Sequence, residues 1–126
     1  MSTWDDLSQD SLLAAKRLLD ANHSRSAASR AYFAAYAAIT SKLSSSVQFG
    51  AGRDNPTHGQ IAELTLNNLR PDRFNKRRRQ GLTTIIRNLQ RNRLTADYSP
   101  HLTLDRETAL ASVREASRLV AELEGV

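Results

Sequence analysis

The stretch from Arg25 to Leu43, RSAASRAYFAAYAAITSKL, decides the fold of this chain. Four alanines recur at helical spacing and share one side of it: Ala27, Ala31, Ala35 and Ala38. Alanine loses no side-chain entropy in a helix and lets a neighbouring helix approach closely. The stretch therefore predicts a helix packed tightly against other helices, and Ser24 is placed to cap its start.

The remaining sequence predicts further helices on both sides of this one. Apolar residues recur at helical spacing over about residues 5–19, 58–69, 75–95 and 104–123. Thr103 is the expected cap of the last helix, and Gly81 is expected to bend or split the one before it. Four long amphipathic helices with short connections predict an all-α, up-and-down antiparallel four-helix bundle, with 58–69 as a short extra helix.

Composition sets limits on the class of protein. The 126 residues are 40% hydrophobic and 25% charged, which is typical of one globular domain spanning 1–126. The absence of cysteine excludes a disulfide scaffold, a thiolate nucleophile and a cysteine zinc site. The acidic start lacks the apolar core of a signal peptide, and the longest apolar run is too short to cross a bilayer. We therefore expect a soluble, cytoplasmic protein with no membrane association.

Positive charge is concentrated in one segment. From Arg70 to Arg93 the chain has nine basic residues and one acidic residue, whereas the other 102 residues have nine basic and twelve acidic ones. The segment thus carries +8 and the rest −3. A concentrated positive field attracts a polyanion such as nucleic acid, although a solvated helix face or a grip on an acidic protein would give the same pattern. The residues assigned to nucleic-acid binding are Arg73, Lys76, Arg77, Arg78, Arg79, Arg87 and Arg91.

Arg93 departs from the pattern of a plain bundle. It continues the inward stripe of its helix by four residues beyond Leu89, so its guanidinium should lie at the edge of the apolar seam. Asp97 follows four residues later and can pair with it if the helix extends that far. This pair is either a structural ion pair or part of a functional site.

Other polar residues with site-like positions are few. Arg30 and Tyr32 lie among the alanines, His58 opens the expected short helix, and Tyr98 and His101 follow Asp97. Tyrosine on a buried face needs a hydrogen-bond partner for its hydroxyl. Three histidines without regular spacing predict no metal site, and the sequence has no phosphate-binding glycine loop or nucleophile elbow. No cofactor is expected.

Three motifs in order resemble those of a known family. They are Ser29-Arg30-Ala31-Tyr32-Phe33-Ala34-Ala35-Tyr36, then Thr57-His58, then Arg93-Leu94-Thr95-Ala96-Asp97-Tyr98. This combination resembles the "higher eukaryotes and prokaryotes nucleotide-binding" (HEPN) domains, especially the stand-alone bacterial and archaeal group with an Arg…Ala-Asp-Tyr signature. The resemblance covers nearly the whole chain. It implies an up-and-down helical bundle, frequent homodimers, and the two polar motifs near a shared cleft.

The resemblance also implies a class of activity. Many members are metal-independent ribonucleases or toxins in toxin–antitoxin and antiviral systems, often paired with a nucleotidyltransferase-like protein. Their catalytic motif is an arginine followed, after four to six residues, by a histidine. Here Asp97 stands at the histidine position counted from Arg91. An aspartate paired with an arginine is a poor proton acceptor, so the resemblance leaves ribonuclease activity open, with His101 or His58 as substitutes for the missing histidine.

The leading hypothesis is therefore a HEPN-like protein that binds RNA or a nucleotide in a toxin–antitoxin or defence module. Arg93 would contact phosphate and Asp97 would orient it, with Arg30, Tyr32, His58 and Tyr98 lining the same cleft. The alternative is a non-catalytic adaptor subunit that uses its basic segment to bind a partner protein or nucleic acid. A third hypothesis is a nucleotide sensor.

Overall fold

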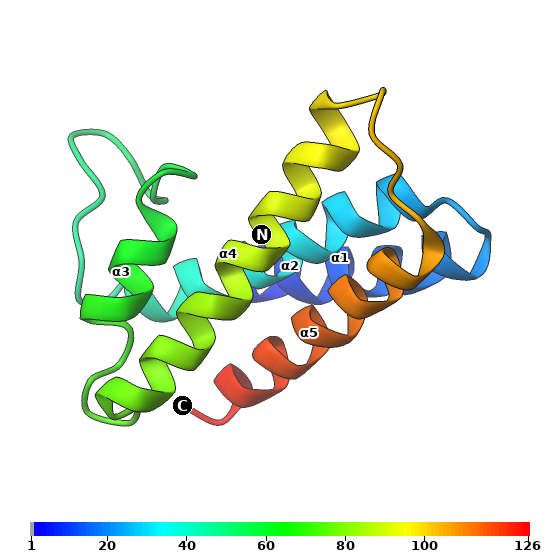
Figure 1. Cartoon of the computed structure of the whole chain (residues 1–126). Coiled ribbons are helices and arrows are strands. Elements are labelled where there is room, and N and C mark those ends of the chain that lie inside the picture. The colour runs from blue at the N-terminus through cyan, green and yellow to red at the C-terminus, as the bar shows by residue number, and fades with distance from the viewer. Residues whose placement is uncertain (1) are drawn as a thin grey trace.

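The computed structural model describes residues 2–126 and is all-α over that range. Successive long helices reverse direction, as Figure 1 shows, so the predicted helical bundle is confirmed. The helices, in chain order, are α1 (Trp4–Asp20), α2 (Ser24–Leu43), α3 (Ile61–Asn68), α4 (Lys76–Tyr98) and α5 (Arg106–Glu124).

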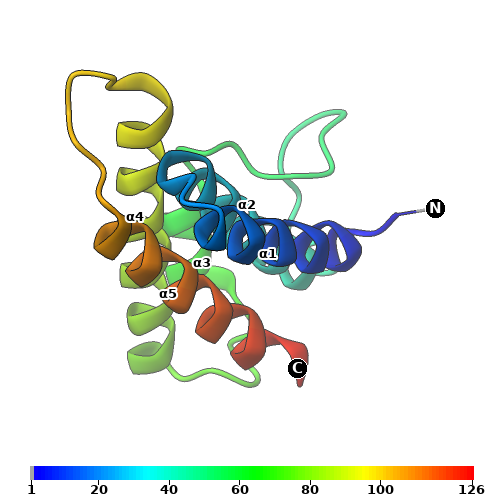
Figure 2. The ribbon, with the colours of Figure 1, turned by 90° about the vertical axis from the view of Figure 1, so that its right-hand side faces the viewer.

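α2 occupies the centre of the bundle. α1, α4 and α5 all pack against it, and Figure 2 shows α1 in front of α2 with α5 running below them. Twelve of its residues are buried, and seven of those are alanines. Because alanine projects only a methyl group, three neighbouring helices can approach one helix at once. The alanine pattern of the sequence thus corresponds to the most enclosed element of the fold.

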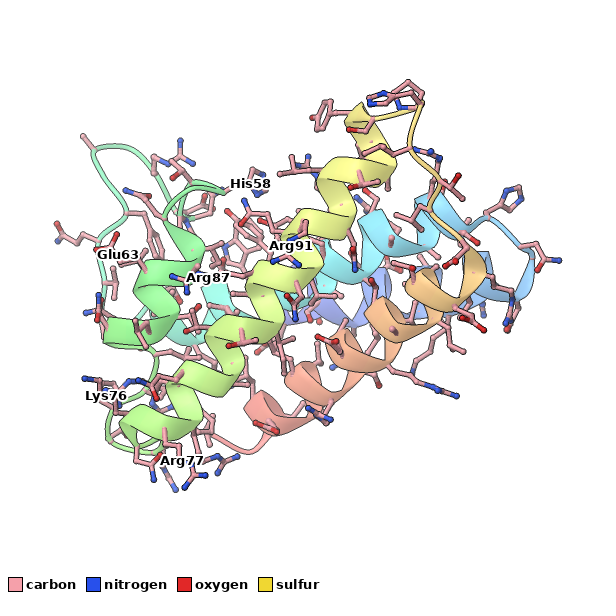
Figure 3. All side chains as sticks on the ribbon, in the orientation of Figure 1. His58, Glu63, Lys76, Arg77, Arg87 and Arg91 are labelled. Carbon is pink, nitrogen blue, oxygen red and sulfur yellow. The ribbon has the colours of Figure 1, made fainter. Side chains whose placement is uncertain are left out.

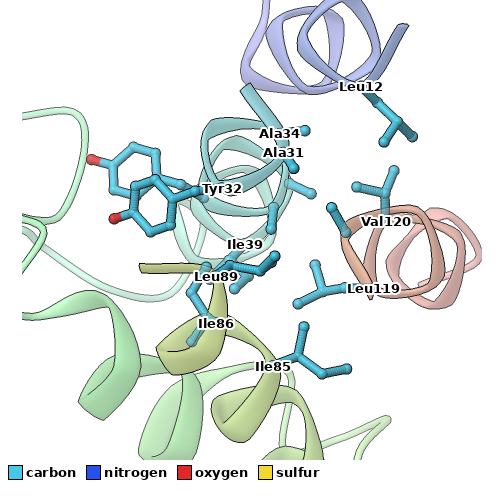
Figure 4. Close-up of a cluster of buried hydrophobic side chains, with 14 of the residues drawn as sticks. Leu12, Ala31, Tyr32, Ala34, Ile39, Ile85, Ile86, Leu89, Leu119 and Val120 are labelled. Atoms are coloured by element: carbon cyan, nitrogen blue, oxygen red, sulfur yellow. The ribbon is translucent and has the colours of Figure 1, made fainter. Parts of the chain in front are cut away.

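The aliphatic core fills the space that the small α2 side chains leave. Ile39, Ile86, Leu89 and Leu119 are each at most 1% exposed. Figure 4 shows them meeting between α2, α4 and α5, with the Tyr32 ring on the side of α2 away from α5. The aromatic face of α2 is therefore turned toward α3 and the loop before it, and its hydroxyls point out of the apolar core.

The helix starts differ from two of the predicted caps. α2 has His23 as its N-cap with no side-chain capping bond, so the prediction for Ser24 was wrong: this serine is already the first helical residue. α5 is capped by Asp105, which accepts a hydrogen bond from the Thr108 amide at 2.8 Å, rather than by Thr103. Asp105 lies directly before the first helical residue, where its side chain can accept from the Thr108 amide. Its negative charge also interacts favourably with the positive end of the helix dipole.

Two helix bounds that shape the candidate site also differ from expectation. α3 begins at Ile61, because Thr57 and Gln60 exchange two hydrogen bonds of 3.0 and 3.2 Å that close a turn before it. His58 therefore lies in a turn and not in a helix. α4 runs unbroken through Gly81 and continues to Tyr98, three residues beyond the predicted end. Asp97 is thus helical, as its pairing with Arg93 requires.

Within residues 2–126, none of the helices combines the length and the apolar character that a bilayer crossing needs.

The C-terminal end of α4 is held to α2 by Arg25. Its Nη1 donates to the carbonyls of Thr95, Ala96 and Ser99 at 3.0, 3.1 and 3.3 Å, and its Nη2 donates to that of Leu102. These carbonyls include ones that the end of an α-helix leaves without a helical partner. One guanidinium therefore fixes both the last turn of α4 and the loop after it.

We expect Arg25→Ala to lower the free energy of unfolding by about 2 kcal/mol, because it removes charge-assisted hydrogen bonds at a helix C-terminus. Urea unfolding followed by circular dichroism measures the change. Arg114→Ala, an exposed arginine on α5, is the matched control and should change stability little. Equal stability of the two variants would contradict the role given to Arg25.

Candidate phosphate-binding site

The turn before α3 brings His58 against the aromatic face of α2. The Tyr32 hydroxyl lies 2.6 Å from His58 Nδ1, and the two ring centroids are 5.5 Å apart. The Tyr36 ring lies 5.0 Å from the same imidazole. Tyr32 and Tyr36 are both almost fully buried, whereas His58 is exposed. His58 thus lies where a buried polar layer meets solvent.

The loop that carries His58 is anchored by the second tyrosine. The Tyr36 hydroxyl donates to the Pro56 carbonyl and accepts a bond of 2.8 Å from Asn55 Nδ2. On the other side, Gln90 Nε2 of α4 donates to the His58 carbonyl at 2.8 Å. The backbone around His58 is therefore held by both α2 and α4, although it has no regular secondary structure of its own.

Arg93 lies next to this cluster, near the C-terminal end of α4. Its Nε is 3.1 Å from Asp97 Oδ2, which confirms the predicted i,i+4 pair. Its guanidinium carbon lies 5.8 Å from the Tyr32 ring centroid and 5.3 Å from that of Tyr98. The side chain keeps 21% of its surface exposed. The cation is therefore partly desolvated between two aromatic rings, yet open to solvent on one side.

Asp97 has a second partner that ties the pair to α2. The Ser29 hydroxyl donates to Asp97 Oδ2 at 3.0 Å. The same carboxylate oxygen therefore accepts a hydrogen bond from Ser29 and forms the ion pair with Arg93. The ion pair orients the Arg93 guanidinium. Both contacts occupy Oδ2 of Asp97, the carboxylate nearest to the site.

Burial sets the protonation of the cluster. Burial, and then the nearby Tyr36, raise the pKa of Tyr32 far above its ordinary value, although Arg93 opposes the shift. Burial, and then the charges of Arg93 and Arg53, lower the pKa of His58 below 6.5. At neutral pH Tyr32 is thus protonated and His58 is neutral.

The hydrogen bond between these two residues then fixes the histidine tautomer. The buried Tyr32 hydroxyl has no other hydrogen-bond partner within residues 2–126, so it is assigned as the donor to Nδ1, which places the ring proton of neutral His58 on Nε2. With this assignment the exposed His58 carries an N–H donor on Nε2, and not a free lone pair. Together with the Arg93 guanidinium, this makes a set of donors suited to an anion.

The structure joins most of the predicted site residues and separates two of them. Hydrogen bonds, an ion pair and ring contacts connect Tyr32, His58, Arg93, Asp97 and Tyr98. Arg30 is exposed and lies over the Phe33 ring at 5.1 Å, so it reaches the cluster only through Phe33 and Tyr36. His101 is exposed in the loop before α5, and the described residues give it no hydrogen bond or ring contact with the cluster.

Sequence reasoning did not assign Ser29, Gln90 or Asn55 to the site. Each of these small polar residues acts through a single hydrogen bond to a segment distant in sequence. Such a bond leaves no periodic signal. The only available hint was the need of two buried tyrosine hydroxyls for partners.

The residues assigned to nucleic-acid binding fall into two groups. Arg78 pairs with Glu122 at 3.4 Å and lies over Phe74, and Arg79 donates to the carbonyls of Leu66 and Phe74 at 2.9 and 2.6 Å. These two guanidiniums are therefore partly occupied by contacts within the protein. The others are exposed: Arg73, Lys76, Arg77, Arg87 and Arg91.

The exposed cations do not form one even patch. Figure 3 shows Arg87 and Arg91 on the part of α4 nearest His58, and Lys76 and Arg77 at the opposite end of the helix. Arg87 and Arg91 are one helical turn apart, and Arg91 lies about 200° around α4 from Arg93. The pair therefore adds positive charge on a different face of α4 from Arg93, on the part of the helix nearest the His58 turn.

No three histidine, aspartate or glutamate side chains within residues 2–126 come together in a way that could hold a metal ion.

Comparison of the chain with protein-family models gives no match, and neither curated proteins nor solved structures match it. The geometry of the cluster and the order of the sequence motifs are therefore the observations that bear on function.

The lowered pKa of His58 predicts a pH dependence of stability. The unfolded chain takes up a proton near pH 6.5, whereas folded His58 resists it, so stability from this group is complete above about pH 6.5 and falls as the pH decreases. We expect His58→Asn, whose side-chain oxygen can still accept from Tyr32, to unfold with a shallower pH dependence between pH 7 and 5. Urea unfolding across this range tests it, and identical pH profiles would contradict the assignment.

Proposed function

We propose that this chain is a HEPN-like protein that binds RNA or a nucleotide and holds one phosphate at Arg93. The observation that carries the proposal is the arginine itself: its Nε is fixed by Asp97, two aromatic rings flank it, and one side remains open to solvent. A guanidinium oriented in this way can use its two terminal nitrogens to bind two phosphate oxygens.

Further donors at the cluster support an anionic ligand. His58 offers its Nε2–H, and the exposed Tyr98 ring carries a hydroxyl next to Arg93. The one carboxylate in the cluster, that of Asp97, is paired with Arg93 and accepts from Ser29. Arg93 and Asp97 cancel in net charge and His58 is neutral, so hydrogen-bond donors, and not net charge, favour a phosphate at the cluster.

Arg87 and Arg91 add exposed positive charge on another face of α4, which supports a polymer as the ligand, because a chain of phosphates extends beyond Arg93. Contacts of exposed lysine and arginine with phosphates give affinity without sequence preference. The order of the Tyr32, His58 and Arg93 motifs, which resembles that of HEPN domains, supports the assignment to a toxin–antitoxin or antiviral defence module.

Binding is better supported than cleavage. Metal-independent RNA cleavage needs a cation at the phosphate, an acid for the leaving oxygen and a base for the 2′-hydroxyl. Arg93 and the His58 Nε2–H can supply the first two. The base is lacking in this arrangement, because His58 Nδ1 accepts from Tyr32 and Asp97 is held by Arg93 and Ser29. Ribonuclease activity is therefore the second candidate, and it requires one of these bonds to break when RNA binds.

The proposed partners include a nucleotidyltransferase-like antitoxin and a second copy of the chain. A groove of about 510 Å³ lies between α4 and α5 and has an apolar floor of Leu82 and Ile85. Its rims carry two arginines and two glutamates, Arg78, Arg118, Glu115 and Glu122. Two copies related by a two-fold axis could place opposite charges against each other here. Light scattering of the purified protein reports this association.

We expect Arg93→Ala to weaken RNA binding at least about tenfold, because it removes charge-assisted hydrogen bonds to phosphate. Arg93→Lys should recover only part of the affinity, because lysine lacks the planar fork. Fluorescence anisotropy with a labelled single-stranded RNA measures both. Arg114→Ala, which removes the same charge from an exposed position on α5, is the matched control.

Equal affinities of Arg93→Ala and Arg114→Ala would reject Arg93 as the phosphate contact. The same proteins are then incubated with RNA in the presence of a chelator. Cleavage that Arg93→Ala abolishes would establish the ribonuclease. Absence of both RNA binding and cleavage, with stable co-purification of a protein partner, would favour the adaptor function.

The paired substitution Arg87→Ala/Arg91→Ala should lower the salt dependence of RNA binding. Each phosphate contact that is lost reduces the slope of log affinity against log salt by about 0.7 for a single strand, so a change of about 1.4 is expected. The control is Lys16→Ala/Arg17→Ala, two exposed basic residues on α1. A slope unchanged from the wild type would show that Arg87 and Arg91 do not contact RNA.

A further inference from the structure

A separate pocket lies between the start of α1 and the segment that joins α2 to α3. Its volume is about 450 Å³, within the size range of small-molecule sites. Its lining includes three apolar side chains, Trp4, Val47 and Phe49, and two charged ones, Arg53 and Asp54. None of these residues belongs to the phosphate cluster.

The apolar wall is held in place from behind. The Trp4 ring makes a T-shaped contact with Tyr36, with centroids 6.1 Å apart and an interplanar angle of 75°. Phe49 is 7% exposed and Val47 is partly buried against the core. Trp4 itself is only partly buried, so its indole is both fixed and accessible. A fixed aromatic surface of this kind suits a flat, apolar ring.

The charged rim is built on a tight turn. The Arg53 amide donates to the Gly50 carbonyl at 3.2 Å, and Gly50 has a φ of 121°, in the region that favours glycine. Arg53 Nε donates to the Asn55 carbonyl at 3.2 Å, which orients the guanidinium. The neighbouring Asp54 carboxylate is exposed. A donor group and an acceptor group therefore stand side by side at the mouth of an aromatic pocket.

This combination matches the edge and the face of a nucleobase. Bases carry hydrogen-bond donors and acceptors next to one another along their edges, and their faces stack on aromatic side chains. An aliphatic ligand would leave the charged pair unused, and a simple anion would be repelled by Asp54. We infer that the pocket beside Trp4 binds a nucleobase, with its ring against the indole and its polar edge toward Arg53 and Asp54.

The pocket is connected to the phosphate cluster through one side chain. Tyr36 touches Trp4 on one side and His58 on the other, with a centroid distance of 5.0 Å to the imidazole. A base at Trp4 and a phosphate at Arg93 would therefore lie on opposite sides of the two tyrosines. This connection rests on the proposed function, whereas binding of the base does not.

Trp4 is the only tryptophan of the chain, so its fluorescence reports the pocket directly. The protein is titrated with adenosine, adenosine 5′-monophosphate and cytidine 5′-monophosphate, and with ribose 5-phosphate, which has no base. We expect saturable quenching by at least one compound with a base and none by ribose 5-phosphate. Free N-acetyltryptophanamide corrects for absorption and collisional quenching.

A matched pair of variants locates the binding. Arg53→Ala/Asp54→Ala should weaken the quenching at least fivefold, because it removes both polar contacts from an exposed rim. Arg106→Ala/Glu107→Ala, which removes one charge of each sign from the exposed start of α5, should leave the quenching unchanged. Equal effects of the two double variants would contradict nucleobase binding at the pocket beside Trp4.

The outcomes separate this inference from the proposed function. Quenching that persists in Arg93→Ala, while RNA affinity falls, supports both sites. RNA binding that depends on Arg93, together with quenching no stronger than that of free indole, overturns the nucleobase pocket and leaves the phosphate site. Saturable quenching that is equal in Arg93→Ala and the wild type, in a protein that binds no RNA, supports the pocket and rejects the phosphate site at Arg93. Quenching by ribose 5-phosphate equal to that by the nucleotides would also contradict nucleobase binding, because this compound has no base.

Discussion

The enclosure of α2 is the constraint on which the rest of the structure depends. α1, α4 and α5 surround this helix, and its alanines leave almost no room between them. Two tyrosines share its remaining side, where they are 1% and 2% exposed. Hydroxyl groups buried to that degree must find hydrogen-bond partners within the protein. The segment before α3 supplies them with His58 Nδ1 and the Pro56 carbonyl. Close packing of a helix thus determines where an otherwise irregular loop, and its histidine, must lie.

The same burial determines what the histidine can do. A buried tyrosine keeps its proton, and because His58 is its one hydrogen-bond partner within residues 2–126, it is assigned as the donor, with the imidazole hydrogen on Nε2. Arg93 lies over Tyr32 and disfavours a second proton on His58. The result is a neutral donor beside a cation, with Asp97 already paired. Under the proposed function this arrangement would stabilise a bound phosphate at neutral pH, whereas a base for RNA cleavage would have to be released from an existing bond.

The sequence predicted the packing of this protein better than the contacts of its site. Helical spacing of apolar residues identified the helices, because an apolar stripe repeats along the outer ones, whereas α2 was identified by its alanines and is buried on nearly all sides. The pair of Arg93 and Asp97 was also predictable, since i,i+4 spacing is a local relation. The two wrong caps, Ser24 and Thr103, reflect competition between nearby polar residues that sequence alone does not resolve. The hydrogen bonds of Ser29 with Asp97 and of Gln90 with His58 join residues that are far apart in the sequence. They could not be predicted, because the relative positions of these segments are defined only in the folded chain.

The division between diffuse and fixed positive charge has a functional reason. Exposed residues such as Lys76 and Arg77 attract any polyanion, but their flexible side chains do not define where along it the protein sits. Arg93 is different, because Asp97, Tyr32 and Tyr98 restrict its position before a ligand arrives. A restricted cation loses less conformational freedom on binding, and it places one phosphate at a defined distance from His58. Under the proposed function, the exposed arginines would attract RNA, and the fixed arginine would position it.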